Sequence, residues 1–270
     1  RDRSVSRGLG DVYKRQMKYS FTPSVTAGVL DVTSGGGDSS PNMYFGLASA
    51  LADTSALRSF SVTDDYTASM DLGTMQGENS TLIIFGNRKN ITGNSNRGMI
   101  IQSGQTVNMR DVGLFTIAES TNSTTGSYAK YYADGSIKYY NNTLTQKGLN
   151  GFTNAAIGED NTIKGSAIYN SGTINIHDSV ISENSLTASG EIYLSGGAIY
   201  NNTGATMNID GSLFYKNSLN AATAAANGGA IFNDGNININ DSIFEGNSAV
   251  SERYARGGAI RNNTGTQYIT

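Results

Sequence analysis

The sequence predicts an all-β protein built as a single-stranded parallel β-helix, with about 30 residues in each coil. The first reason is a repeat: a Gly-Gly-Ala-Ile block returns at a nearly constant interval, which is typical of stacked supersecondary units. The second reason is that short alternating apolar and polar segments follow each block, with no helical periodicity between them. The copies close at glycines 30–37 residues apart: Gly104, Gly135, Gly172, Gly204, Gly235 and Gly265.

Each predicted coil holds three short β segments. The segment after the closing glycine alternates strictly, as in Thr173–Ile176, and residues 137–139 read the same way in a looser upstream copy. A second apolar pair follows, and then an Asn three residues on, as from Phe214 to Asn217. The Gly-Gly pairs and the Asn-rich stretches supply positive φ at the corners, and asparagines in one register are expected to form an amide ladder.

Two adjacent columns of the aligned copies differ in what they accept. One column hardly varies and is expected to point into the core: Ile100, Ile168, Ile199, Ile231 and Ile260. The next column accepts arginine and is expected to point outward: Ile101, Tyr169, Tyr200, Phe232 and Arg261. Because an aspartate in the core would be a buried unpaired charge, we expect Ile231→Asp to disrupt the stack locally and Phe232→Asp to be far milder.

The chain divides into three parts. Residues 1–16 are basic, unlike the rest, and resemble the translated sequencing-adapter tail at the ends of metagenome-derived reading frames. Residues 17–79 are expected to form an irregular capping or connecting region with a short helix at 48–52. Residues 80–270 are expected to form the β-helix, with strands beginning at Thr81–Phe85 and with truncation at the carboxyl end.

Composition limits the classes of function. The chain has 270 residues and a formal net charge of −3, which argues against a nucleic-acid or anionic-membrane surface. It has no cysteine, so a disulfide framework and a thiolate metal site are excluded. No window has the run of about 18 apolar residues that a membrane helix requires.

Two motifs invite a hydrolase interpretation. The segment 37–41, Gly-Asp-Ser-Ser-Pro, resembles the surround of a trypsin-like serine, but Ser40 stands where a glycine is needed and no histidine lies upstream. We interpret the segment as a Gly/Ser-rich loop. The single histidine, His177, shares its column with Arg110, Asp210 and Asn240 and is expected to be an ordinary exposed residue.

A pectate-lyase-like site is the third candidate, since such enzymes share the β-helix and use clustered carboxylates on calcium with an arginine base. Asp178 and Asp241 recur one per coil, but serine and glycine surround them. Surface ion pairing is the simpler interpretation, and we predict no catalytic, cofactor-binding or metal-binding residues. The best basic patch lies near Glu252 and comprises Arg253, Arg256 and Arg261.

The Gly-Gly-Ala-Ile blocks at 196, 228 and 257, with Phe214–Asn217 and Phe244–Asn247, resemble the repeat of chlamydial polymorphic outer-membrane proteins and of autotransporter passengers. The copy at 165 departs from the repeat, with Ser166 for glycine and Ile181 for phenylalanine. The resemblance implies an exported, right-handed β-helical passenger anchored in the outer membrane by a carboxyl-terminal barrel that is not in this chain.

The predicted function is that of a non-catalytic adhesin passenger. It is expected to contact a host or neighbouring-cell surface protein or glycan, and not nucleic acid, through the loops Ser185–Ser195 and Ser218–Asn227. The expected location is the cell surface or outer membrane of a Gram-negative bacterium, or the secreted fraction. The alternatives are a secreted pectate-lyase-like polysaccharide lyase and a purely structural stalk.

Overall fold

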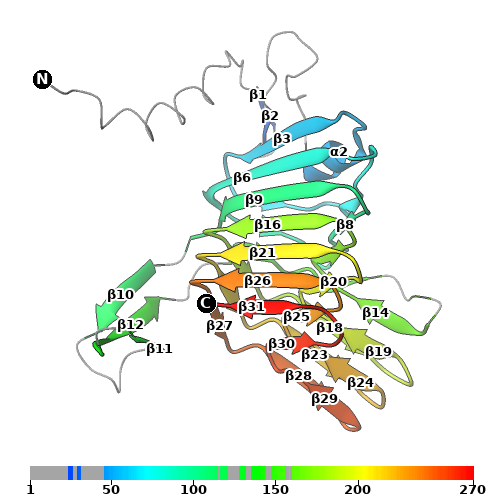
Figure 1. Ribbon diagram of the computed structural model, residues 1–270. Helices are drawn as coiled ribbons and strands as arrows, with labels where there is room; N and C mark the ends of the chain where they lie inside the picture. The colour runs from blue at the N-terminus through cyan, green and yellow to red at the C-terminus, as the bar shows by residue number, and fades with distance from the viewer. Residues whose placement is uncertain are drawn as a thin grey trace, which may run out of the picture.

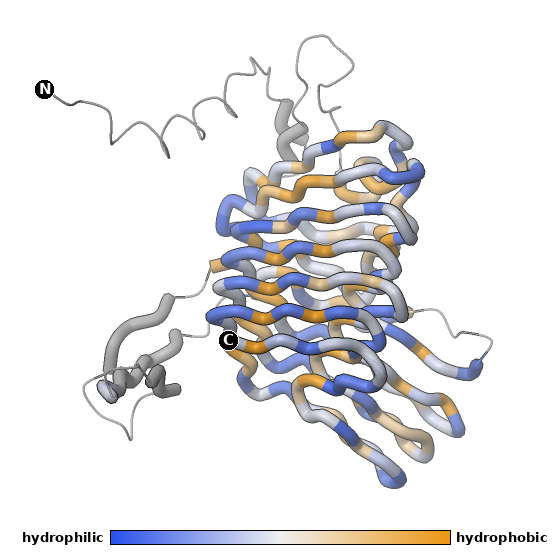
Figure 2. Tube along the Cα trace, viewed as in Figure 1, coloured by the Kyte–Doolittle hydropathy of each residue, from blue (hydrophilic) through white to orange (hydrophobic). Residues whose placement is uncertain are grey.

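The chain winds into a solenoid of stacked coils, with each coil adding one strand to each of three sheets (Figure 1). The strands of these sheets pair in parallel from residue 57 onward, and the two short strands before it pair antiparallel. This computed structural model describes residues 24–26, 29–31, 46–114, 116–120, 128–131, 135–143, 147–155, 158 and 160–270. The parallel β-helix predicted from the repeat is therefore confirmed. Apolar and polar residues alternate along the coils, as Figure 2 shows, because successive side chains in a strand point to opposite faces.

Three sheets run the length of the solenoid. The nine-stranded sheet comprises, in order, β1 (Ser24–Thr26), β2 (Val29–Asp31), β3 (Leu57–Val62), β6 (Thr81–Lys89), β9 (Thr106–Val112), β16 (Thr173–His177), β21 (Thr206–Asp210), β26 (Asn236–Asn240) and β31 (Gln267–Ile269). The second sheet comprises β4 (Tyr66–Thr67), β7 (Ile91–Thr92), β13 (Leu149–Asn150), β17 (Val180–Ser182), β22 (Leu213–Tyr215) and β27 (Ile243–Glu245). The third comprises β5 (Gly73–Thr74), β8 (Met99–Ile101), β15 (Ile168–Asn170), β20 (Ile199–Asn201), β25 (Ile231–Asn233) and β30 (Ile260–Asn262).

The core is a set of apolar columns between these sheets. Ile168, Ile199 and Ile231 lie opposite one another in register and are fully buried, as the repeat predicts. The prediction that Ile100 belongs to this core column is wrong: Met99 pairs with Ile168, and Ile100 is 38% exposed. The reason is a shift of one residue, which turns every side chain of a strand to the opposite face.

The solenoid begins before residue 80. Strand β3 pairs in parallel with β6, and β4 and β5 pair with the strands of the next coil. The predicted short helix is present as α2 (Leu47–Ala52), whose Leu47 and Leu51 are fully buried in the main core. Residues 46–79, which were predicted to be irregular apart from the short helix, therefore form an ordered helix and a complete coil.

The looser copy around Gly135 is not a coil. Strand β12 (Ile137–Thr143) pairs antiparallel with β10 (Thr116–Ser120) and with β11 (Tyr128–Tyr131), which makes a separate three-stranded sheet. Strand β9 instead pairs directly with β16. Short connections allow antiparallel pairing, whereas a parallel strand needs a long crossover, so the alternating segment at 137–139 was assigned to the wrong kind of sheet.

The aromatic column faces away from the main core, but it is not exposed. The rings of Tyr169, Tyr200 and Phe232 stack with centroids 5.3 and 5.2 Å apart. Tyr200 and Phe232 are only 6% and 7% exposed, because each ring covers the next. Phe232→Asp is therefore expected to cost more than it would at an exposed position, while remaining milder than Ile231→Asp.

Asparagine amide ladders run along the stack in three registers, where the sequence predicted one. In the buried ladder, Asn170 donates to Asn201 (2.7 Å), Asn201 to Asn233 (2.6 Å) and Asn233 to Asn262 (2.7 Å). A second ladder joins three asparagines that follow the second sheet: Asn184, Asn217 and Asn247. The third lies on the outer face of the nine-stranded sheet. Each ladder satisfies amide groups that burial or stacking would otherwise leave without partners.

The Gly-Gly pair meets two separate requirements. Gly228 has a φ of 72°, in the left-handed region. Gly229 lacks a positive φ, but a Cβ there would lie 2.0 Å from the carbonyl oxygen of Gly258 in the next coil. In the copy with Ser166 at this position, the serine hydroxyl donates a hydrogen bond to the Gly197 carbonyl of the next coil (2.5 Å).

Gly229→Ala is expected to lower the free energy of unfolding by about 1–3 kcal/mol, because two backbones must separate to admit the methyl group. Gly204→Ala is the matched control, since its Cβ would meet nothing within 4 Å and only the φ of 81° opposes it. We expect a cost of about 1 kcal/mol for the control. Chemical denaturation measures both, and an equal loss would contradict the close-stacking explanation.

A lateral arm branches from the solenoid between the second and third sheets (Figure 1). Its first sheet comprises β18 (Ser185–Ala188), β23 (Ser218–Ala221) and β28 (Ser248–Ser251). Its second comprises β14 (Thr162–Lys164), β19 (Tyr193–Ser195), β24 (Ala225–Asn227) and β29 (Tyr254–Arg256). Leu186, Leu194 and Leu219 form a small core of its own. The arm is thus an ordered, stacked extension of the solenoid.

Candidate functional site

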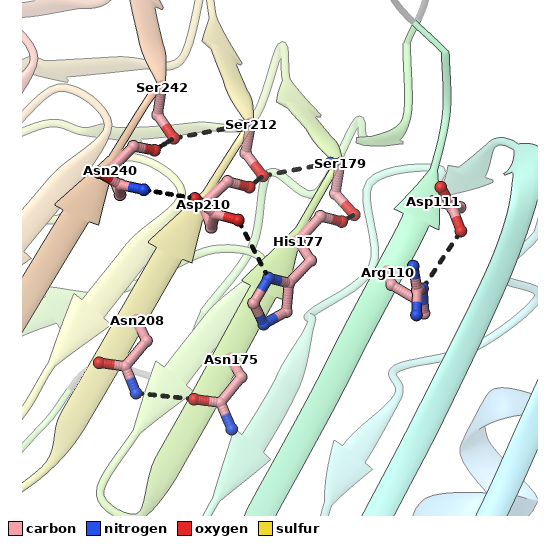
Figure 3. Close-up of polar contacts among 10 residues, drawn as sticks. All are labelled: Arg110, Asp111, Asn175, His177, Ser179, Asn208, Asp210, Ser212, Asn240 and Ser242. Carbon is pink, nitrogen blue, oxygen red and sulfur yellow. Dashed lines mark hydrogen bonds and ion pairs between the residues drawn. The ribbon is translucent and has the colours of Figure 1, made fainter. Parts of the chain in front are cut away.

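Three parts of the surface carry the side chains that the sequence singled out: the outer face of the nine-stranded sheet, the corners that follow its strands, and the lateral arm. Figure 3 shows the first two. On the outer face, Asn175 donates to Asn108, Asn208 to Asn175 and Asn238 to Asn208, each at 2.7 Å. Each amide is thereby tied to its counterpart in the neighbouring coil.

His177 lies in the column that the sequence assigned to it. It pairs in register with Arg110 on one side and Asp210 on the other, and Asn240 follows. Its Nδ1 lies 3.6 Å from Oδ2 of Asp210, and the two side chains are 47% and 48% exposed. Asn240 donates to the second carboxylate oxygen of Asp210 at 2.9 Å. The prediction that His177 is an exposed residue on a solvated face is confirmed.

Three serines, one from each of three successive coils, lie beside this column, and their hydroxyl groups are hydrogen bonded to backbone and are not arranged as nucleophiles. The hydroxyl of Ser179 donates to the backbone carbonyl of His177 (2.7 Å), not to the imidazole. Ser212 and Ser242 donate in the same way to the carbonyls of Asp210 and Asn240, both at 2.8 Å. Each hydroxyl oxygen also accepts a backbone N–H from the preceding coil. These serines tie the coils together at a corner, because both sides of each hydroxyl are engaged by backbone.

The recurring aspartates are corner residues. Asp178 and Asp241 have φ values of 47° and 44°, and Asp111 in the same column has 54°. Gly211 holds the same place in the intervening coil, with a φ of 55°. Aspartate is one of the few side chains that adopt this conformation readily, so backbone geometry accounts for the recurrence. Within the described ranges, His, Asp and Glu side chains nowhere gather in the groups of three that would suit a metal ion.

The three arginines of the basic patch near Glu252 do not share one set of contacts. Arg253 pairs with Glu191 at 3.5 Å, and both Arg253 and Arg256 lie over the ring of Tyr254, at 5.6 and 5.5 Å from its centroid. Arg261 lies instead over Phe232, at 5.8 Å. Arginine–aromatic contact organises this patch more than the acidic neighbours do. The Gly-Asp-Ser-Ser-Pro segment at 37–41 lies outside the described residues.

The two segments predicted to be contact loops are parts of the arm. Ser185–Ser195 contains β18 and β19, and Ser218–Asn227 contains β23 and β24, so their backbones are paired across coils. Large exposed apolar side chains remain on them and on the equivalent segment of the last coil: Tyr193 at 42%, Val250 at 55% and Tyr254 at 52%. The sequence placed the projecting surface correctly but missed its sheet structure, because strands so rich in Ser and Ala carry little alternation.

Comparisons with protein-family models, with curated proteins and with solved structures give no match to this chain. None of the helices in the described residues is long and apolar enough to cross a bilayer.

Proposed function

We propose that this chain is a segment of a surface-displayed autotransporter adhesin passenger, a non-catalytic β-helical scaffold. It attaches through its lateral arm to a protein or glycan on a host or neighbouring cell, at the surface or outer membrane of a Gram-negative bacterium or after secretion. The observation that carries the proposal is the arm: an ordered projection with its own core that presents large aromatic side chains to solvent. Exposed, rigidly held aromatic and arginine side chains are the residues on which binding energy concentrates.

The arrangement of the remaining polar groups supports a scaffold. Asp178 and Asp241, the recurring aspartates weighed for a lyase-like site, form corners of the stack, and the serines beside the His177 column donate to backbone carbonyls. The ladders and stacked rings hold the coils in register, so the arm strands that each coil contributes keep a fixed spacing of about 4.8 Å. A rigid, repeated surface binds a ligand without having to order itself first, which favours attachment.

Binding of the whole chain to intact cells tests the proposal. We expect saturable binding that falls at least tenfold in the double variant Tyr193→Ser/Tyr254→Ser. Tyr268→Ser is the control, because Tyr268 is 66% exposed but lies on the nine-stranded sheet. Absence of saturable binding would favour a stalk, and sustained release of unsaturated product from polygalacturonate with calcium would favour a lyase. Either result contradicts the proposal.

A further inference from the structure

The arm meets the solenoid in a corner surface formed by Lys164, Tyr200, Asn227, Phe232, Arg256 and Arg261. One wall of the corner surface is a face of the second arm sheet, and the alternation of side chains along its strands identifies the residues on that face. Leu194 and Ala226 point into the core of the arm, so the flanking positions point to the opposite face of the same sheet. Tyr193, Asn227 and Arg256 therefore share one face. The stacked rings of the third sheet form the floor.

Contacts join the wall to the floor. Lys164 Nζ lies 5.3 Å from the ring centroid of Tyr200, although the two residues come from the arm and the solenoid. On the floor, the guanidinium of Arg261 continues the file of rings by covering Phe232. The corner surface thus combines flat aromatic area with cationic side chains, which is the composition that binds both apolar ring faces and anions.

Positive charge in the corner surface exceeds the negative charge available to it. Lys164 is paired with Asp160 at 2.7 Å, but across the described part of the chain neither Arg256 nor Arg261 forms an ion pair. Asp234 attracts Arg261 without contacting it: Asn263 lies between them, accepting from Nη2 of Arg261 (3.0 Å) and donating to Asp234 (2.8 Å). Burial, and then the charge of Arg256, lower the pKa of Arg261. An anion would relieve this repulsion.

Two polar atoms of the corner surface are buried without a hydrogen-bond partner. One is a donor, Nε of Arg261, and the other is an acceptor, Oδ1 of Asn227. Asn227 lies directly opposite Arg256 in the register of the arm. Arg261 also donates from Nη2 to Oδ1 of Asn263 at 3.0 Å, so only its Nε is left without a partner. Buried polar groups are nearly always satisfied, so an orphaned donor and acceptor beside two guanidinium groups that lack an ion pair indicate that something polar binds here.

We propose that the corner surface and the arm face beside it bind a carboxylated polysaccharide, a chain of uronic acid residues. Arg256 and Arg261 hold its carboxylates, and Tyr193 and Tyr254 receive the apolar faces of its sugar rings. This inference rests on the proposed function and names its ligand class. Tyr193 and Tyr254 are two strands apart, with Ala225 between them, so their backbones are separated by about 9.6 Å, which an extended disaccharide spans.

The planar fork of arginine suits a carboxylate, because two parallel N–H groups can donate to its two oxygens. A polymer of phosphates suits the site less well. Binding to such a polymer depends on many basic contacts along the backbone, whereas this chain has a net charge of −3 and, at this place, two arginines that lack an ion pair in the described residues. We therefore expect the site to prefer a polymer that carries carboxylates on sugar rings over a polymer of phosphates.

Calorimetric titration of the whole chain with polygalacturonate and with its methyl ester tests the inference, because esterification removes the charges and keeps the rings. We expect binding to the acid form alone, weakened at least tenfold by Arg256→Gln/Arg261→Gln and weakened by salt. The charge-matched control Arg88→Gln/Arg97→Gln removes two exposed arginines at the other end of the solenoid and should bind normally.

Four results would overturn the inference: no binding of the acid polymer, equal binding of the ester, an unaffected double variant, or equal binding of duplex DNA, which would indicate a general anion surface. Cell binding separates this failure from that of the proposed function. Saturable attachment that Arg256→Gln/Arg261→Gln leaves unchanged would keep the adhesin and remove the uronic acid ligand. If the unmodified chain shows no saturable attachment to cells, the proposed adhesin function itself is contradicted.

Discussion

Ile231→Asp is expected to lower the free energy of unfolding by about 3–5 kcal/mol, because it places an unpaired carboxylate in the main core. Ile231 is fully buried between Ile199 and Ile260 in the neighbouring coils, and all three lie in register. For a chain of this size the loss corresponds to roughly a 10 °C fall in the unfolding midpoint. Circular dichroism during heating measures it.

The defect should be local at first. In a solenoid each coil contacts only its neighbours, so stability is close to a sum of coil and interface contributions. Amide hydrogen exchange is therefore expected to accelerate in β20, β25 and β30 before it changes in β3 and β6. Uniform acceleration along the chain would show instead that the coils unfold as one cooperative unit.

Phe232→Asp provides the comparison, since the residue is next in sequence but faces away from the main core. It loses a nearly buried ring that stacks on Tyr200, which contributes about 1.5–3 kcal/mol through burial. Its carboxylate, however, lies beside the guanidinium of Arg261, which compensates the charge. We expect a loss of about 2 kcal/mol, and equal midpoints for the two variants would contradict the facing of the two columns.

The columns were predictable because stacking places equivalent residues in equivalent surroundings. A position that must be apolar in one coil must be apolar in the next, so comparison of copies within the chain identified Ile168, Ile199 and Ile231 as core. The same logic placed His177 beside Asp210. Both results follow from local pattern plus one assumption, namely that the coils lie in register.

Predictions failed where register or pairing depends on distant segments. Gly98 was aligned with the second glycine of the repeat, but it lies against Ala167, where a Cβ would be 1.8 Å from the carbonyl oxygen. That shift of one residue exposes Ile100. The corner surface was not predictable either, because Lys164, Tyr200 and Arg261 come from three coils and meet only through the geometry of the arm.

Arg58→Met is expected to release the helix that covers the first coil, at a cost of about 3–5 kcal/mol to that end of the solenoid. Arg58 is fully buried, and its guanidinium donates to carbonyls at the end of α2: Ala50 (3.2 Å), Leu51 (3.4 Å) and Asp53. It also donates to the Gln76 carbonyl (2.8 Å) and to the Ser80 hydroxyl (2.5 Å).

These contacts explain why a charge is kept in the core. The last carbonyls of a helix have no partner within it and carry partial negative charge, which a cation satisfies. Methionine fills similar space but donates nothing, so the carbonyls of Ala50 and Asp53 lose this donor, although the Leu51 carbonyl still accepts from the Gln76 N–H (2.8 Å). Leu47 and Leu51 are then held over the first coil less firmly. Lysine, with three donors on one atom, should restore little.

Arg97→Met is the matched control, because Arg97 pairs with Asp71 at 3.5 Å and both side chains are about half exposed. An exposed pair contributes about 0–1 kcal/mol, so this variant should resemble the unmodified chain. Limited proteolysis near residue 53, together with amide exchange in β3, separates the two variants. Equal protection in both would mean that the apolar contacts of α2 alone hold the helix in place, and that Arg58 is dispensable for it.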